Sequence, residues 1–317
     1  MPSSRSQSMA AGRPSGPAGG GRTRRHALGS ALAPYAFLAP AILLVLGMLV
    51  YPLGYAVYFS FTNKAMIREA YDQVGWSNYS ALVHNAAFWT ALWHSVLLTV
   101  TTGILTLVLG GLLALLLNRR FRLRGMFRGI LLVPWVMPPI VTGLMFRWLC
   151  NDYYGWLNHV LQQLHLTSQP VLFLVDTRWV WMVLITANAW IEYPFVMLMF
   201  LAALQSINPD FYRAAKVDGA SVLQRFWHIT LPGLRKALLL IGLLEVIFMF
   251  KSFDLVWIIT KGGPGTTTET LATFAYRHAF EGYETGYGSA AAMVIFVVLF
   301  AVSLVYLSIP ATRTEEA

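Results

Sequence analysis

Charged side chains and cysteine are both scarce in this sequence of 317 residues. Asp, Glu, Lys and Arg make up 12% of the chain, whereas a soluble domain carries about 25%. With 57% hydrophobic residues and a mean hydropathy of +0.58, the composition argues against a soluble globular enzyme. The single cysteine, Cys150, excludes a disulfide framework, a four-thiolate zinc site and a cysteine-ligated iron–sulfur cluster. An integral membrane protein is the class that remains.

Long apolar segments, by contrast, recur along the chain. A membrane-spanning helix needs about 20 mostly apolar residues, and six segments reach that length. They lie at approximately 33–60, 91–117, 127–149, 179–203, 237–260 and 287–309. The sequence therefore predicts an all-α, polytopic membrane protein with six transmembrane helices, in a transmembrane domain over residues 31–317.

Basic residues concentrate on one side of the predicted membrane. Of the 23 Lys and Arg residues, sixteen lie in the N-terminal tail, in the loops after the second and fourth helices, and at the C-terminus. The positive-inside rule places these segments in the cytoplasm. We therefore expect a multi-pass plasma-membrane protein with both termini cytoplasmic. The net charge of +9 then reflects topology, and no nucleic-acid partner is expected.

The first 30 residues are rich in Ser, Gly, Pro and Arg and contain no acidic residue. This composition predicts a disordered, basic cytoplasmic tail that contacts anionic membrane lipid. A secretory signal peptide is the alternative, because Ala39-Pro40-Ala41 is similar to a cleavage site. The apolar run continues well past Ala41, however, which favours an uncleaved membrane anchor.

The loop over residues 204–236 interrupts the apolar pattern with helix-boundary signals. Asn208 is suited to cap a short helix with Pro209 in its first position, and Gly219 is suited to end that helix. These signals predict a short helix on the cytoplasmic surface.

A second short helix is predicted to follow, because Ser221 and Gln224 form a capping-box pattern. It would lead into the membrane. In the first helix, one face is predicted from spacings of three and four residues. That face contains Phe211, Ala214, Ala215 and Asp218. The small alanines favour close docking against another surface, although an ordinary surface helix pair would give the same signals.

The same loop resembles the cytoplasmic coupling motif, or EAA loop, of binding-protein-dependent ABC importer permeases of the type I class. The usual pattern is Glu-Ala-Ala, three residues, Gly, and later Ile and Leu-Pro. Arg213 stands where the family usually has Glu, and it would pair with an acidic residue of the partner. The resemblance assigns ATPase coupling to Arg213, Ala214, Ala215, Asp218, Gly219, Ala220, Phe226, Leu231 and Pro232.

Other motifs, which cover nearly everything after residue 35, resemble sugar permeases of the maltose and glycerol-phosphate type. These motifs are Tyr51-Pro52, Ser60-Phe61-Thr62, Gly75-Trp76-Ser77-Asn78-Tyr79, Asn118-Arg119-Arg120, Pro134-Trp135 and Thr260-Lys261-Gly262-Gly263-Pro264. The resemblance implies the transmembrane domain of a type I ABC importer. It also implies that the chain forms half of a pathway for a sugar or related hydroxyl-rich solute in a prokaryotic membrane.

A phosphate-binding Gly-x-x-x-x-Gly-Lys-Ser/Thr motif is missing from the sequence. We therefore expect that the chain is not an enzyme and binds no cofactor itself, and that a partner uses ATP and Mg²⁺. The resemblance implies three protein partners: a cytoplasmic ABC ATPase dimer, a second homologous permease and an extracytoplasmic solute-binding protein.

Charged residues at membrane depth cost about 2.5–3.5 kcal/mol each on insertion scales, so they usually serve a purpose. Lys251 and Asp254, three residues apart, are predicted to form an ion pair on one helix face, with contact to the solute as the alternative. Sugar sites combine carboxylates and amides with aromatic faces. On this chemistry, and because the matching positions line the cavity of maltose-type permeases, the predicted pathway residues are Asn188, Glu192, Phe195, Glu245, Phe248 and Met249. Plain interhelical packing is the alternative for Phe248 and Met249.

Two other classes of protein remain as alternatives. A proton-coupled secondary carrier would use Glu192 and Glu245 but would not require the two-helix cytoplasmic loop. A membrane scaffold protein would not require the buried acids. The histidines show no metal-ligand spacing, so no metal site is predicted, and no catalytic arrangement is evident.

Overall fold

The computed structural model describes residues 38–119 and 121–309, and all regular secondary structure in those ranges is helical. The predicted tail, residues 1–30, lies outside the described residues. The chain divides into two compact units, Met1–Tyr55 and Ala56–Ala317. An apolar helix begins in the first unit and ends in the second.

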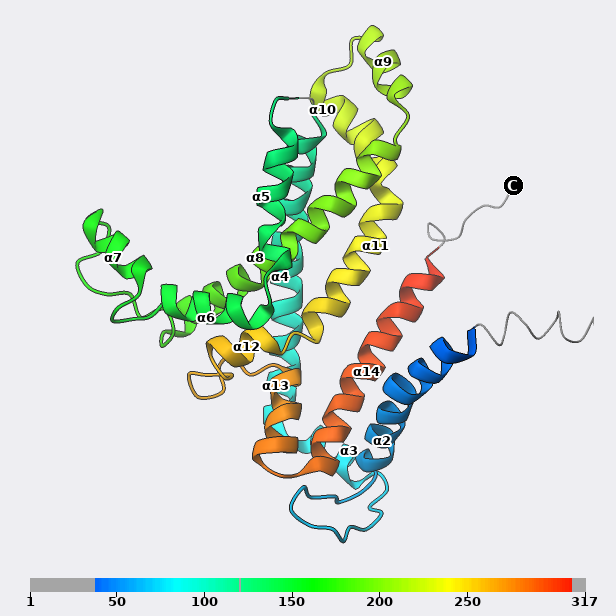
Figure 1. Cartoon of the computed structure of the whole chain (residues 1–317), viewed down its shortest axis with the longest axis vertical. Coiled ribbons are helices and arrows are strands. Elements are labelled where there is room, and N and C mark those ends of the chain that lie inside the picture. The colour runs from blue at the N-terminus through cyan, green and yellow to red at the C-terminus, as the bar shows by residue number, and fades with distance from the viewer. Residues whose placement is uncertain (1–37, 120, 310–317) are drawn as a thin grey trace, which may run out of the picture. The chain divides into compact units, whose positions relative to one another are not determined.

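Helices of very different lengths alternate along the chain (Figure 1). In chain order they are η1 (Leu46–Val50), α2 (Tyr51–Ser60), α3 (Ser77–His84), α4 (Ala86–Asn118), α5 (Arg124–Val136), α6 (Pro139–Leu149), α7 (Trp156–Gln163), α8 (Thr177–Ser206), α9 (Pro209–Val217), α10 (Val222–Arg225), η2 (Phe226–Thr230), α11 (Leu231–Phe250), α12 (Asp254–Ile259), α13 (Leu271–Tyr276), η3 (Arg277–Glu281) and α14 (Thr285–Ser308). In the second unit, α9 and α10 lie at one end, and α3 and α13 lie at the other (Figure 1).

Four helices in the described ranges are long and apolar enough to cross a membrane: Leu38–Ser60, α4, α8 and α14. A fifth span results if α5 and α6 are counted together. The prediction of six spans is compatible with this arrangement but is not confirmed by it. The twenty-residue α11 contains Arg235, Lys236 and Glu245 and is not among the four.

The predicted third helix, residues 127–149, is wrong as a single helix. The structure has α5 and α6 instead, bent by 92° relative to each other. Met137, between them, has φ −72° and ψ 135°, the extended conformation that a following proline imposes. Pro138 follows it and supplies no N–H group for a continuing helix.

The predicted fifth helix, residues 237–260, is also interrupted. Helix α11 ends at Phe250, and α12 begins at Asp254. Within the interruption, the Ser252 hydroxyl donates a hydrogen bond to Asn188 Oδ1 of α8 at 2.9 Å. This is a contact between residues 64 positions apart, and periodicity within one segment does not reveal it.

Polar side chains cap the two longest helices, α4 and α8, at their N-termini. Asn85 Oδ1 accepts from the backbone N–H of Ala87 at the start of α4, and Asp176 Oδ1 accepts from that of Arg178 at the start of α8. Helix α8 continues through Pro194, so this proline does not end the helix.

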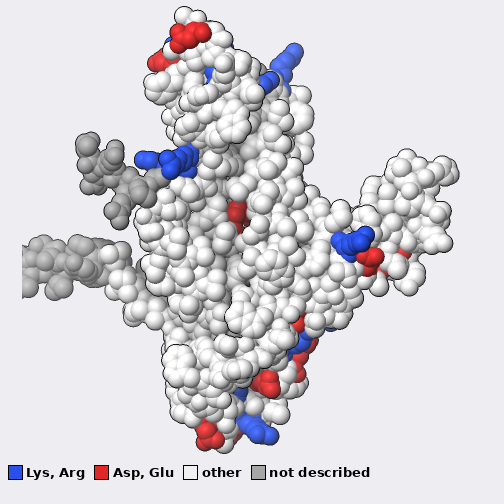
Figure 2. Space-filling model, turned by 180° about the vertical axis from the view of Figure 1, so that it is seen from behind, with Lys and Arg blue, Asp and Glu red and all other residues white. Residues whose placement is uncertain are grey.

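The charged side chains are unevenly distributed. Figure 2 shows a face on which Lys, Arg, Asp and Glu gather toward the two ends of the helices and at the base of a lateral arm, with few charges between them. A band with so few charges is compatible with the hydrocarbon core of a bilayer.

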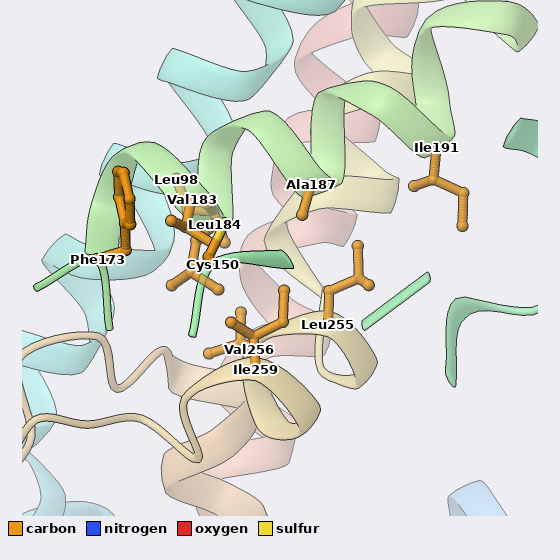
Figure 3. Packing of buried hydrophobic residues seen from close by; sticks show 10 residues of the cluster. All are labelled: Leu98, Cys150, Phe173, Val183, Leu184, Ala187, Ile191, Leu255, Val256 and Ile259. Atoms are coloured by element: carbon orange, nitrogen blue, oxygen red, sulfur yellow. The ribbon is translucent and has the colours of Figure 1, made fainter. Parts of the chain in front are cut away.

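The buried core forms where α8 packs against its neighbours. Figure 3 shows Leu184 and Ala187 of α8 close to Val256 and Ile259 of α12. Farther along α8, Val196 and Met197 belong to a second buried cluster that includes Ala114 of α4. Helix α8 is therefore packed along much of its length.

Gly110 allows the close approach of α4 to α8. A Cβ atom at this position would lie 2.7 Å from Val196 Cγ1 and 2.9 Å from the backbone nitrogen of Met197. Gly103 lies seven residues earlier in the same helix. A Cβ atom built on it would have no atom within 4 Å. The two glycines thus differ sharply in their surroundings.

We expect Gly110→Ala to lower the thermal unfolding midpoint of the purified protein in detergent, because overpacking a core costs about 1–3 kcal/mol. Gly103→Ala is the matched control in the same helix and should leave the midpoint close to the wild-type value. Equal midpoints for the two variants would contradict the close α4–α8 contact.

An ion pair connects the loop between α12 and α13 to η3. Arg277 Nη1 lies 2.7 Å from Glu269 Oε1, with the Glu269 side chain 5% exposed and the Arg277 side chain 30% exposed. Arg277 Nη2 also donates to the backbone oxygen of Lys261 at 2.7 Å. Burial raises the pKa of the Glu269 carboxyl above its usual range, and Arg277 and His278 partly oppose this rise.

Removal of Arg277 should therefore destabilise the protein in a pH-dependent way. The folded protein holds the Glu269 proton more tightly than the unfolded chain does, because the pKa of this carboxyl is raised on folding. The free energy of unfolding therefore falls as the pH rises from the unfolded-state pKa through the folded-state pKa of Glu269. Arg277→Met raises the folded-state pKa of Glu269 further, so its thermal midpoint should fall more at pH 8 than at pH 5. Arg68→Met, at an exposed position, is the control and should lack this pH dependence. An equal drop of the Arg277→Met thermal midpoint below wild type at pH 5 and pH 8 would refute the ion pair with Glu269.

Candidate functional site

A pocket of about 200 Å³ lies where α6, α8, α11 and α12 meet. It combines an amide, two carboxylates, an ammonium group and a hydroxyl with aromatic and aliphatic walls. The lining residues are Pro139, Asn188, Ile191, Glu192, Phe248, Met249, Lys251, Ser252, Phe253, Asp254 and Leu255.

Both helix interruptions open onto this pocket. Pro139 begins α6 directly after the 92° bend, and the non-helical residues 251–253 separate α11 from α12. Irregular backbone at membrane depth is tolerated only where it is buried in protein or lines a cavity. The interruptions and the pocket are therefore parts of one feature.

Asn188 anchors one wall of the pocket and is 1% exposed. Its Nδ2 donates to the backbone oxygen of Leu184 at 2.8 Å, and its Oδ1 accepts from the Ser252 hydroxyl at 2.9 Å. The amide thus connects α8 to the interruption after α11. Glu192 lies one turn farther along α8 and lines the same pocket.

Aromatic rings continue the pocket wall toward α5. Phe248 lies edge-on to Phe195 with ring centroids 5.8 Å apart, and Phe195 lies 6.0 Å from Trp135. Lys251 Nζ is 5.5 Å from the centroid of the Phe248 ring, within the range of a cation–π interaction.

The structure brings most of the predicted pathway residues together, with one exception. The pocket is lined by Asn188, Glu192, Phe248 and Met249. Phe195 packs against the ring of Phe248. Glu245 does not line the pocket.

Glu245 instead faces α4. Its Oε2 accepts a hydrogen bond from Thr106 Oγ1 at 2.8 Å, and it lines a separate apolar cavity of about 420 Å³ formed by α4, α11 and α14. Glu245 shares the continuous helix α11 with Phe248 and Met249 but does not line their pocket, because its carboxylate is hydrogen-bonded to Thr106 of α4. Its role in the pathway stays a prediction.

The predicted ion pair between Lys251 and Asp254 is not formed in the described part of the chain. The two residues lie on either side of the interruption and not on one continuous helix, so a spacing of three does not bring their charges together. Both line the pocket. The alternative given for this pair, contact with the solute, fits their position in the pocket lining. Ser252 and Phe253 were not singled out from the sequence, because the interruption has no clear sequence signal.

The cytoplasmic loop of the prediction folds as its boundary signals indicate. Asn208 Oδ1 accepts from the backbone N–H of Asp210 at 2.9 Å, and Pro209 begins α9. Gly219 follows α9 with φ +74°, a conformation that favours glycine. Ser221 and Gln224 form the capping box at the start of α10. The local helix predictions are confirmed.

A cavity of about 700 Å³ lies beside α9. The four residues predicted to share one face all line it, together with residues of the adjoining elements. Its lining is Ser206, Ile207, Asn208, Phe211, Ala214, Ala215, Asp218, His228, Ile229 and Gly233.

Two contacts connect α9 and the residue after α8 to η2 and the first turn of α11. The Tyr212 hydroxyl is 2.9 Å from the Thr230 hydroxyl. A Cβ atom on Gly233 would lie 2.9 Å from Ile207 Cδ1, so these residues are in close contact. Neither pair was singled out from the sequence, because each depends on how the loop folds back.

The remaining predicted coupling residues surround α9. Arg213 forms an exposed ion pair with Asp210 at 3.0 Å, a type of contact that contributes about 0–1 kcal/mol. Phe226 and Leu231 line a neighbouring hollow, and Pro232 stands in the first turn of α11. The coupling role of these residues stays a prediction.

Comparison with known proteins identifies the family. The model of the "binding-protein-dependent transport system inner membrane component" family matches residues 106–311. A sulfoquinovosyl glycerol transport system permease protein of Agrobacterium fabrum is 35% identical over 292 residues, covering 92% of this chain and 94% of the relative.

Other relatives cover similar shares. A diacetylchitobiose uptake system permease protein of Streptomyces coelicolor is 32% identical, covering 95% of this chain and 93% of the relative. A chain in the crystal structure of a bacterial alginate ABC transporter, in complex with an alginate pentasaccharide-bound periplasmic protein, has a TM-score of 0.77 at 23% identity. That alignment covers 93% of this chain and 99% of the other, and it shows a shared fold.

The chain therefore belongs to the family of inner membrane components of binding-protein-dependent transport systems, and it is a permease subunit of an ABC importer.

Proposed function

We propose that the chain forms half of the translocation pathway for a sugar or related hydroxyl-rich solute. The observation that carries this proposal is the pocket between the interrupted helices. Its amide, carboxylates and hydroxyl suit sugar hydroxyls, and Phe248 and Phe253 suit the apolar faces of a sugar ring. The relatives' names, which refer to a glycosyl glycerol and a chitin disaccharide, support the same solute class.

ATP hydrolysis in this proposal belongs to a cytoplasmic ABC ATPase dimer, which would use ATP and Mg²⁺. The chain has no phosphate-binding motif of its own. Helix α9 would dock in a cleft of the ATPase through the cavity-lining face that contains Ala214, Ala215 and Asp218. A second homologous permease would complete the pathway, and an extracytoplasmic solute-binding protein would deliver the solute.

The topology follows from the same assignment. The end of the second unit that contains α9 would face the cytoplasm of a prokaryotic cell, as the distribution of basic residues predicts. The pocket would then communicate with the opposite side.

Movement would pass between the ATPase and the pocket through rigid helices. Helix α8 ends at Ser206, two residues before Asn208 caps α9, and η2 continues directly into α11. The same two helices carry Glu192 and Phe248 into the pocket. A rigid-body change at α9 would therefore change the pocket directly.

We expect Gly219→Asp to reduce ATP-dependent uptake at least about ten-fold, because both the positive φ and the docking surface beside α9 are disturbed. The amount of permease in the membrane should be unchanged. Proteoliposomes containing the assembled importer provide the uptake measurement. Gly125→Asp is the control, at a glycine whose Cβ position is also open. Wild-type uptake by the Gly219 variant would refute the coupling role.

Glu192→Gln should raise the solute concentration needed for half-maximal uptake about ten-fold, because a charged hydrogen-bond acceptor is lost from the pocket. Glu245→Gln is the matched control, since its amide oxygen still accepts from Thr106, and its half-maximal concentration should stay near wild type. Both values are measured from initial uptake rates. Equal behaviour of the two variants would contradict the pocket assignment.

A further inference from the structure

An aromatic cluster extends the pocket away from α8. It consists of Phe253, Trp257, Tyr276 and Phe280 and joins the start of α12 to α13 and η3. Phe253 belongs to both features, because it also lines the pocket. The cluster and the pocket are therefore continuous at this side chain.

The rings form an ordered array. Phe253 and Trp257 are stacked, with centroids 5.6 Å apart and an interplanar angle of 19°. Tyr276 lies 4.7 Å from each of them, and Phe280 lies 4.9 Å from Tyr276. Helices α12 and α13, which contain Trp257 and Tyr276, lie close together in Figure 1.

The array is not a closed core. Phe253, Trp257 and Tyr276 are each partly exposed, and Phe280 is 52% exposed. The buried residues Leu255, Val256 and Ile259 of α12 face away into the core with α8. Helix α12 thus contributes one side to the core and leaves its aromatic side accessible.

Two hydrogen-bonding groups in the array are unused. Neither the indole N–H of Trp257 nor the hydroxyl of Tyr276 forms a hydrogen bond with any described residue. Trp and Tyr are enriched at interfaces because each combines an apolar ring with a group that forms hydrogen bonds. Here both groups belong to rings of the array, which meets the pocket at Phe253.

We infer that this array is a second sugar subsite, at which one ring of a glycoside or oligosaccharide binds while a neighbouring ring occupies the pocket. Ring faces bind the apolar side of a sugar ring, and the free N–H and hydroxyl groups bind its hydroxyls. The inference rests on the proposed function. It adds that the preferred solutes contain two or more rings.

Tests of this subsite use the complete importer with its solute-binding protein in proteoliposomes. The probe is a mixture of isotope-labelled mono-, di- and trisaccharides and glycosides, and mass spectrometry measures their ATP-dependent accumulation. Wild-type importer should accumulate solutes with two or more rings in preference to single rings.

Trp257→Ala should lower the accumulation of these solutes about five- to ten-fold, the size expected for losing one aromatic contact and one hydrogen bond. Trp257→Phe should recover at least half of the wild-type level, because it restores a ring. Tyr276→Phe, which keeps the ring and removes only the hydroxyl, should lower accumulation about two- to five-fold. Trp156→Ala, at an exposed tryptophan of α7 outside the array, is the matched control and should match wild type.

The outcomes separate the two claims. Failure of the wild-type importer to accumulate any sugar would overturn the proposed function, and the subsite with it. Accumulation of sugars that is equal in wild type, Trp257→Ala and Tyr276→Phe would overturn the subsite alone, as would accumulation of single rings only. Thermal unfolding midpoints identify a variant that fails to fold, and Tyr276→Phe then provides the decisive comparison.

Discussion

The need to satisfy backbone polar groups away from water determines where this largely apolar protein can interrupt its helices. An interruption at membrane depth leaves N–H and C=O groups without helical partners, and these groups are tolerated only in buried or cavity-lining positions. The bend between α5 and α6 and the break between α11 and α12 both meet this condition at one pocket. The polar side chains that gather there are consequences of the same constraint.

Tight packing of α8 complements these interruptions. Helix α8 remains continuous from Thr177 to Ser206, even through Pro194, and Gly110 allows α4 to approach it closely. On the other side, Asn188 forms a hydrogen bond with Ser252 in the interruption between α11 and α12. A continuous helix thus lies against an interrupted one. This is a suitable arrangement for a permease that must change the shape of its pathway without unfolding.

The loop that contains α9 and α10 is joined directly to two helices that line the pocket. Helix α8 leads into α9, and η2 returns the chain directly into α11. The hydroxyl contact of Tyr212 with Thr230 and the packing of Ile207 on Gly233 make the loop part of the helical body. A force applied to α9 would therefore act on two of the helices that line the pocket.

Local and compositional signals in the sequence determined the membrane class, the all-α fold and the helix boundaries in the loop over residues 204–236. Asn208, Gly219 and the Ser221–Gln224 box act within a few residues, so their effects are readable from one segment, and the loop motif also identified the family. Only the tertiary structure decided that α11 breaks at Ser252, that Lys251 and Asp254 line a pocket without pairing, and that Glu245 faces Thr106. Helical periodicity gives the face of a residue only while the helix continues, which is why it failed for Lys251 and Asp254. Within a continuous helix it does not give the partner from a distant segment, which is Thr106 for Glu245.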